Sequence, residues 1–193
     1  MHRARLEQGG RTRARLVEAA QGLLVAQGAE GMSLQRVAAK VGVTVGAVQA
    51  HFGSKTGLLL AVLELSQVEA GQRWRDALAH LAGSDDWVAD VVQVLWELAT
   101  DDLLIARQEV QRAARHDAAV AQRFEELVAA DFMSTEQIAD ALGVQADDHW
   151  EMSFAAVASM VDSLAQVRSL RDPAHTQERL QRISAWCAPL LRR

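Results

Sequence analysis

The sequence predicts an all-α protein, in which an N-terminal three-helix helix-turn-helix domain is joined by a long helix to a second helical domain. Its 193 residues include two prolines and no tyrosine, and residues that favour helices dominate the composition. Apolar residues recur at three- and four-residue spacing, whereas no alternating β-branched stretch bounded by turn residues indicates a strand. We therefore expect helices along the whole chain.

The front of the chain predicts four helices, each with residues suited to a helix terminus. Serine or threonine stands at the expected N-cap positions, because its hydroxyl accepts a hydrogen bond from a free amide of the first turn. Glycine stands at the breaks, since it takes the left-handed conformation that follows many helices. The expected helices span residues 11–27, 34–41, 45–52 and 55 to about 81.

The second and third of these helices predict a helix-turn-helix motif. Each has about eight residues, and isolated helices shorter than about 12–15 residues are marginal in water. They must therefore pack together and on the first helix, across the tight turn at Gly42. Val48 and Phe52 lie four residues apart and are expected to face this core.

Beyond Gly83 the sequence predicts five longer helices. Aspartates stand near several expected starts, where the positive end of the helix dipole favours them, and Pro173 suits a first helical turn. The expected ranges are 86–100, 102–115, 117–142, 147–170 and 173–191.

Charge is distributed unevenly along the chain, whose formal net charge is −5. Residues 1–60 hold eight basic and three acidic residues, and the remaining 133 residues hold 12 basic and 22 acidic ones. This asymmetry indicates an N-terminal end that faces nucleic acid. A solvated charged tail is the alternative interpretation.

Other features exclude several classes of protein. Cys187 is the single cysteine and cannot form an internal disulfide, and no apolar run approaches the roughly 18–20 residues that cross a bilayer. The basic N-terminus lacks the apolar segment of a secretory signal, so a cytoplasmic location is the default expectation. Zinc-ligand spacing, a phosphate loop and a nucleophile elbow are all missing from the sequence. We therefore expect no metal, no cofactor and no enzyme activity.

The expected helix at 45–52 has the composition of a helix that enters the major groove of DNA. Gly46 and Ala47 remove bulk, so the N-terminal end of the helix fits a groove about 12 Å wide. Thr44 has a hydroxyl for a phosphate or a base, Val45 has methyl groups for a thymine methyl, and Gln49 suits adenine.

Residues that flank this helix are expected to hold the DNA backbone. Lys55 adds an ammonium to the positive dipole end of the following helix, and His51 lies at the end of the reading helix. Ser33 and Gln35, at the start of the preceding helix, are within reach of a phosphate or an outer base. An ordinary helical bundle is the alternative interpretation, because glycine-linked helix pairs also occur there.

The block from about Arg11 to Leu65 contains an ordered pattern: a small hydroxyl residue, a Val-Ala pair, Gly-Val-Thr, another glycine, His-Phe and Ser-Lys. The pattern is carried by Ser33, Val37, Ala38, Gly42, Val43, Thr44, Gly46, His51, Phe52, Ser54 and Lys55. With this pattern, the block resembles the N-terminal domain of the TetR family of transcriptional repressors. The family usually has tyrosine where this chain has Gln49. Either Gln49 reads a base, or the backbone contacts depend more heavily on His51, Lys55 and the N-terminal arginines.

The resemblance implies a helix-turn-helix DNA-binding domain at 1–54, with a disordered basic arm at about 1–9, and a helical ligand-binding and dimerisation domain at 55–193. Apolar stripes on the last two expected helices indicate a four-helix bundle between two chains. Ala155, Ala158 and Ser159 are small enough for close helix approach. The expected interface residues are Val157, Val161, Leu164, Leu180, Ile183 and Cys187. Packing of the stripes inside one chain is the alternative.

Aromatic residues and methionines concentrate between residues 66 and 170 and predict an adaptable apolar pocket. The expected wall residues are Trp96, Phe132, Phe154 and Met160, with Arg107 and Gln111 as charged and polar contacts. Ordinary core packing is the alternative for each of them.

Taken together, the sequence predicts a dimeric regulator that a small apolar or amphipathic effector releases from a palindromic operator. A helical dimeric sensor or interaction protein, with weak or lost DNA binding, is the alternative.

Overall fold

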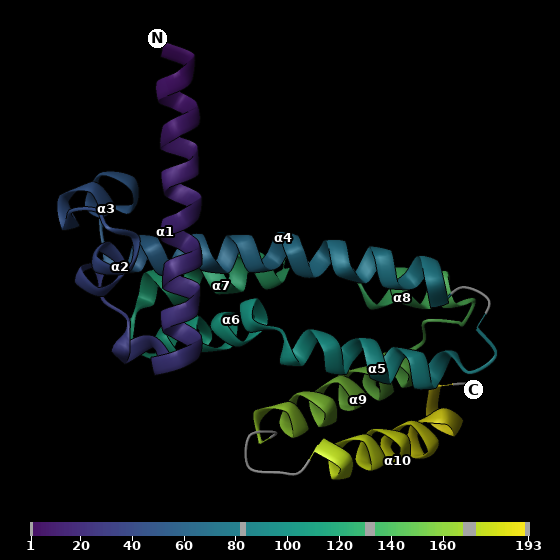
Figure 1. Ribbon diagram of the computed structural model, residues 1–193. Coiled ribbons are helices and arrows are strands. Elements are labelled where there is room, and N and C mark those ends of the chain that lie inside the picture. Colours follow the sequence, from purple (N-terminus) through teal and green to yellow (C-terminus); the bar gives the residue numbers. More distant parts are fainter. Residues whose placement is uncertain (1, 82–83, 130–133, 168–172, 192–193) are drawn as a thin grey trace. The chain divides into compact units, whose positions relative to one another are not determined.

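The computed structural model describes residues 2–81, 84–129, 134–167 and 173–191, and all regular structure within these ranges is helical (Figure 1). The predicted all-α class is therefore confirmed. The helices are α1 (His2–Gly31), α2 (Leu34–Val41), α3 (Val45–Phe52), α4 (Lys55–Leu81), α5 (Trp87–Thr100), α6 (Asp102–Ala113), the short 3-10 helix η1 (Ala114–His116), α7 (Ala118–Ala129), α8 (Thr135–Leu142), α9 (Asp148–Gln166) and α10 (Pro173–Leu191).

The chain forms two compact units. The first unit combines residues 1–68 with 102–130, and the second combines 69–101 with 131–193. α4 runs from the first unit into the second, and the chain re-enters the first unit where α6 begins. The units follow packing rather than function, so a functional division after residue 54 stays a prediction.

The first unit is built around α1. α6 and α2 pack against α1, and α3 packs against α2. Because α2 and α3 have only eight residues each, this packing rather than their length stabilises them. The fully buried side chains of the first unit include Leu16, Leu24, Val37, Val48, Leu58 and Val110.

α1 differs from the prediction at its start. It begins at His2 rather than Arg11, so the segment predicted to be a disordered arm continues the helix. The arginine, alanine, leucine and glutamate in this segment all favour helices. The break predicted at Gly28 is present as a kink, where that residue has φ 69° and ψ 178°, a conformation that glycine accepts without strain.

The second unit packs α5, α9 and α10 against one another, and α8 contacts α9. The single helix predicted at 117–142 is instead two helices, α7 and α8. Ser134 caps the start of α8: its hydroxyl accepts a hydrogen bond from the Gln137 amide, and the Gln137 side chain accepts one from the Ser134 amide. This capping box was readable from the Ser-x-x-Gln spacing.

Within the described ranges, no helix combines the length and the apolar character that crossing a membrane requires.

Candidate nucleic-acid interface

Local hydrogen bonds fix the ends of α2 and α3. The Ser33 hydroxyl accepts from the Arg36 amide at 3.3 Å, and the Thr44 hydroxyl accepts from the Ala47 amide at 3.2 Å. Gly42, between the helices, has φ 79°, a left-handed conformation in which other residues are strained. The predicted caps and turn are therefore all present in the structure.

α3 has a buried face and an exposed face. Val48 is completely buried, and Phe52 packs against the same core. Thr44, Gly46 and Gln49 are exposed. The exposed face is therefore slim at its N-terminal end and has one long polar side chain, which is what entry into a groove requires.

Two of the predicted reading residues are less accessible than expected. Val45 is half-buried and packs against the core of the first unit, and Ala47 is also half-buried. Any contact between Val45 and a thymine methyl group must use the part of the side chain that remains exposed.

Lys55 begins α4, as predicted, and its ammonium already makes a contact within the protein. Nζ donates a hydrogen bond of 2.6 Å to the carbonyl oxygen of Ala29, just after the kink in α1. An ammonium has three donors, so this contact leaves capacity for a phosphate. Lys55 therefore has a structural role in addition to its predicted one.

The other predicted backbone contacts lie near these residues. Gln35 is exposed in the first turn of α2, whereas Ser33 is half-buried at its cap. The His51 ring is half-buried and lies 6.0 Å from the Phe52 ring, measured between centroids. Contact between any of these residues and DNA stays a prediction.

Two of the N-terminal arginines also hold α1 against the helix-turn-helix. The Arg13 guanidinium lies over the Phe52 ring, 5.3 Å from its centroid. Arg15 donates a hydrogen bond of 3.1 Å to the Val41 carbonyl at the end of α2. An exposed cation–π contact contributes about 0.5–1 kcal/mol, so these arginines help to orient α2 and α3.

Gly57 is a further residue whose importance the sequence did not reveal. A Cβ atom at this position would lie 2.0 Å from the Phe52 carbonyl oxygen. Only glycine therefore allows the first turn of α4 to lie so close to the last residue of α3.

Asp117 is the other such residue. One carboxylate oxygen accepts a hydrogen bond of 2.6 Å from the Thr56 hydroxyl. The other accepts from the amides of Ala119 (3.1 Å) and Val120 (3.2 Å) at the start of α7. The hydrogen bond from Thr56, helped by the two amides and opposed by burial, lowers the pKa of Asp117 from its ordinary value. The sequence identified Asp117 as a helix start, but its partner 61 positions away left no local signal.

The predicted ligand-binding residues that the structure describes are divided between the two compact units. Arg107 and Gln111 lie on α6 in the first unit, whereas Trp96, Phe154 and Met160 lie in the second. The Arg107 guanidinium covers the Phe124 ring at 5.3 Å from its centroid. Gln111 is exposed, Trp96 is half-buried and Met160 is 38% exposed. Phe132 lies outside the described residues.

Phe154 belongs to a closed aromatic cluster in the second unit. Its ring stacks on Trp150 at a centroid distance of 5.1 Å and tilts against Trp74 at 6.1 Å. All three side chains are buried. Phe154 therefore packs the core of this unit, which is the alternative that the sequence left open.

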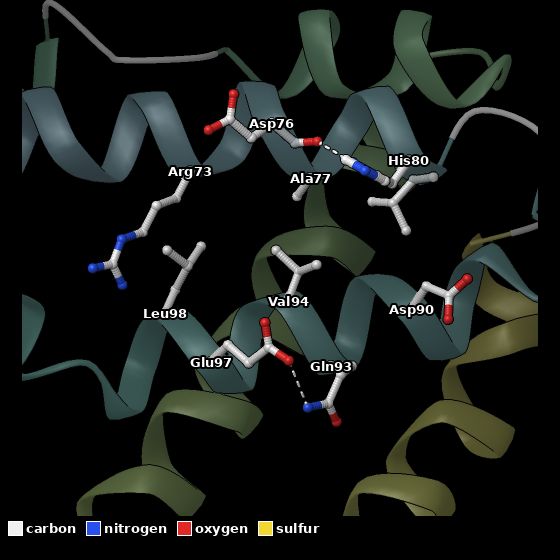
Figure 2. Close-up of a pocket in the computed structure, with 10 residues that line it drawn as sticks. Arg73, Asp76, Ala77, His80, Asp90, Gln93, Val94, Glu97 and Leu98 are labelled. Carbon is white, nitrogen blue, oxygen red and sulfur yellow. Dashed lines mark hydrogen bonds between the residues drawn. The ribbon is translucent and has the colours of Figure 1, made fainter.

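A cleft of about 580 Å³ lies between α4 and α5 in the second unit (Figure 2). Its lining contains three carboxylates, those of Asp76, Asp90 and Glu97, and one guanidinium, that of Arg73. Arg73 forms an ion pair of 2.7 Å with Asp101. Apolar side chains complete the walls, so the cleft combines apolar surface with negative charge. It is lined by Arg73, Asp76, Ala77, His80, Leu81, Asp90, Gln93, Val94, Glu97 and Leu98.

The predicted dimer residues require a correction. Five of the six are buried within a single chain, where α9 and α10 pack on each other and on α5, and Ile183 is half-buried. A side chain already covered by its own chain offers no surface to a partner, so five of the six pack inside one chain, and a dimer contact of Ile183 stays a prediction. The five are Val157, Val161, Leu164, Leu180 and Cys187.

The opposite face of α9 is the exposed one. Met152 is 75% exposed, and Ala155, Ala156, Ser159 and Met160 are exposed along the same helix. This face includes two of the small residues that were predicted to allow close helix approach, Ala155 and Ser159.

Comparison with known proteins places the helix-turn-helix in a family. Residues 16–62, which include α2 and α3, match the bacterial regulatory proteins of the TetR family. The HTH-type transcriptional regulator CymR of Pseudomonas putida is 30% identical over 126 residues, covering 65% of this chain and 62% of CymR. The chain therefore spans about three fifths of the length of that relative.

Two solved structures are similar over most of the chain. GusR of Salmonella enterica has a TM-score of 0.66 at 17% identity, with 94% of this chain and 96% of GusR covered. The multidrug binding protein EbrR, complexed with ethidium, has a TM-score of 0.56 at 24% identity, with 89% and 96% covered. At these identities the two structures show a shared fold. The matched family consists of transcriptional regulators rather than enzymes, and residues 16–62 of this chain, with the helix-turn-helix, belong to the TetR family.

Proposed function

We propose that the chain is a homodimeric, DNA-binding transcriptional repressor that a small amphipathic effector releases from a palindromic operator. The observation that carries this proposal is the division of α3 into a buried face with Val48 and a slim exposed face with Thr44, Gly46 and Gln49. Membership of a family of transcriptional regulators supports it. A regulator that acts on a bacterial chromosome works in the cytoplasm, and a cytoplasmic location is therefore part of this proposal.

Gln49 is proposed to read a base. Its exposed amide can pair with adenine N6 and N7, and a good bidentate pair discriminates by about 1–3 kcal/mol. A duplex selected from a random library by the purified protein supplies the operator. Gln49→Ala should then relax the preference at one base pair of each half-site. A preference unchanged at every position would show that Gln49 does not read the sequence.

Lys55 is proposed to contact a phosphate. Lys55→Ala should weaken binding to all duplexes and reduce the slope of log K against log salt by about 1. Gln49→Ala removes no charge and should leave this slope unchanged, which makes it the matched control. If Lys55→Ala leaves both affinity and slope unchanged, the phosphate contact is wrong. Failure of the wild-type chain to shift any duplex at low salt would favour the sensor without DNA binding.

A second copy is proposed to dock on the exposed face of α9. Two-fold symmetric half-sites lie about one helical turn of DNA apart or a multiple of it, so reading them requires a dimer. Small residues such as Ala155 and Ser159 allow two helices to approach closely. Ala155→Arg should shift the protein to a monomer in sedimentation velocity, whereas Ala119→Arg, at an exposed alanine of α7, should not. Equal dimer content in both variants would exclude this face.

The effector is proposed to bind in the cleft between α4 and α5. Its acidic and apolar lining favours a basic amphipathic molecule, and the ethidium bound to EbrR is a suitable probe. Glu97→Gln should weaken ethidium binding in a fluorescence titration, and Glu136→Gln, at an exposed residue of α8, should not. Absence of saturable binding to the wild-type chain would exclude ethidium-like cations as effectors.

Release from DNA requires that the effector bind the DNA-free conformation more tightly than the DNA-bound one. α4 contributes Lys55 at its start and one wall of the cleft near its end. A tilt of this helix would therefore change the separation of the two reading helices in the dimer.

A further inference from the structure

We propose that Asp117 is a positioning residue for α3 and that it acts through Thr56. The inference rests on the proposed DNA-binding function, because it assigns to Asp117 a part in presenting the reading helix. Asp117 lies between η1 and α7, in a region that the sequence predicts to serve ligand binding and dimerisation. The structure places this region in the same compact unit as α1, α2 and α3.

The first step is the contact between Asp117 and Thr56. Both oxygens of the carboxylate are used: one caps α7 through two backbone amides, and the other accepts the Thr56 hydroxyl at 2.6 Å. Hydrogen bonds to charged groups contribute more than those between neutral groups. Because the cap fixes the carboxylate on α7, the bond to Thr56 fixes the first turn of α4 to the same point.

The second step leads from α4 to α3. Thr56 is followed by Gly57, whose Cα lies so close to the Phe52 carbonyl that an added Cβ would come within 2.0 Å of the oxygen. The Ser54 amide also donates to that carbonyl at 2.8 Å. Phe52 is the last residue of α3. The first turn of α4 therefore cannot shift toward α3 without displacing the end of that helix.

A second series of hydrogen bonds links α6 to the start of α4 through α1. Glu109 on α6 accepts a hydrogen bond of 3.4 Å from the Ala29 amide, and the Ala29 carbonyl accepts the Lys55 ammonium at 2.6 Å. Asp117 thus contacts Thr56 directly, and Glu109 is linked to Lys55 through Ala29. Thr56 and Lys55 are consecutive residues at the start of α4. α6 is also where the chain re-enters the first unit, so a displacement of α6 and η1 reaches α3 through these contacts.

The test compares variants at Thr56. Thr56→Val keeps the shape of the side chain and removes the hydroxyl, and it leaves the Asp117 cap of α7 intact. A looser α4 lowers the fraction of protein in which α3 is correctly presented, and the apparent Kd rises in inverse proportion to that fraction. We expect Kd for the selected duplex to rise roughly fivefold to tenfold with Thr56→Val. Thr56→Ser, which restores the hydroxyl, should bind within about twofold of the wild-type protein.

Two further readouts separate positioning from general damage. Thr56→Val should leave the salt slope of binding unchanged, because it removes no phosphate contact. It should also speed hydrogen exchange of the α3 amides in the free protein. Asp147→Ala is the control for general destabilisation, because it removes an aspartate cap on α9 in the second unit. Asp147→Ala should lower the stability of the protein without changing the hydrogen exchange of the α3 amides or the Kd for the selected duplex.

The outcomes are distinct. If the wild-type chain binds its selected duplex and Thr56→Val binds equally well with unchanged α3 exchange, the role of Asp117 is overturned. Equal losses in Thr56→Val and Asp147→Ala would also overturn it, because general destabilisation would then explain both. If the wild-type chain selects no duplex, the proposed function fails, and the exchange of the α3 amides alone tests whether Asp117 holds the helix.

Discussion

The two compact units are specified by different kinds of interaction. In the first unit, two eight-residue helices have their ends fixed by side-chain caps and by glycines with positive φ. In the second unit, α9 and α10 have 19 residues each and are held by large buried side chains such as Trp150 and Leu180. Local caps and glycines therefore define the helix-turn-helix of α2 and α3, whereas long-range packing defines the second unit.

This difference shows where a sequence can be interpreted with the least ambiguity. A cap acts over three residues, so its pattern is visible in the chain. A long amphipathic helix has more than one apolar or small face, and only its neighbours determine which face is buried. The exposed Met152 and the buried Val157, both on α9, illustrate this point.

The greatest loss of stability is expected in the core of the second unit. Trp150 is 1% exposed and stacks on Phe154, so Trp150→Ala should lower the free energy of unfolding by about 3–5 kcal/mol. Trp186 on α10 is 58% exposed, and Trp186→Ala should change the stability of the monomer by less than about 1 kcal/mol. Urea denaturation measures both. Similar losses in the two variants would contradict the packing of this unit.

The next effect is in the first unit, at Gly57. Gly57→Ala forces a Cβ against the Phe52 backbone, and overpacking of this kind costs about 1–3 kcal/mol. Gly22→Ala is the control, because its Cβ would meet only the mobile end of the Lys40 side chain, which can move away. The control should gain up to about 1 kcal/mol from higher helix propensity. Denaturant midpoints that move in the same direction would refute the close approach of α4 to α3.

Removal of one cap from each unit tests the comparison directly. Thr44→Ala and Ser134→Ala each remove an N-cap hydroxyl, and each should cost about 1 kcal/mol. Thr44→Ala should also speed hydrogen exchange of the α3 amides, because that helix has only two turns. If Ser134→Ala has the same effect on α3, the caps do not act locally.

The smallest effect is the pH dependence due to Asp117. Its pKa is lowered in the folded protein from an ordinary value of 3.8, chiefly by the hydrogen bond from Thr56. A lowered pKa contributes stability above pH 3.8 that is lost as the pH falls through the folded value. The difference in stability between the wild-type protein and Asp117→Asn should therefore shrink as the pH falls from 5 toward 3. A difference that stays constant over this range would exclude the ionised carboxylate as the stabilising form.

Much of the reading motif was predictable from the chain. Ser33, Gly42, Thr44 and Gly53 mark the ends of α2 and α3, and the structure places those ends where these residues predict them. The partners of Thr56 and Arg13 were not predictable, because each contact joins residues far apart in the sequence. The proposed effector site was missed for a related reason. Six of its ten lining residues are polar or charged and none is Phe or Trp, whereas aromatic residues such as Phe154 pack the core.

Local patterns in the chain predict the helical class, the helix-turn-helix and its resemblance to the TetR family. These depend on short-range patterns of caps, glycines and apolar spacing, which physical chemistry relates directly to local conformation. Packing between helices places α6 and η1 in the first unit and covers Val157 and Val161 within their own chain. It also leaves an acidic cleft between α4 and α5. Those outcomes depend on which helix faces meet, and no single helix contains that information.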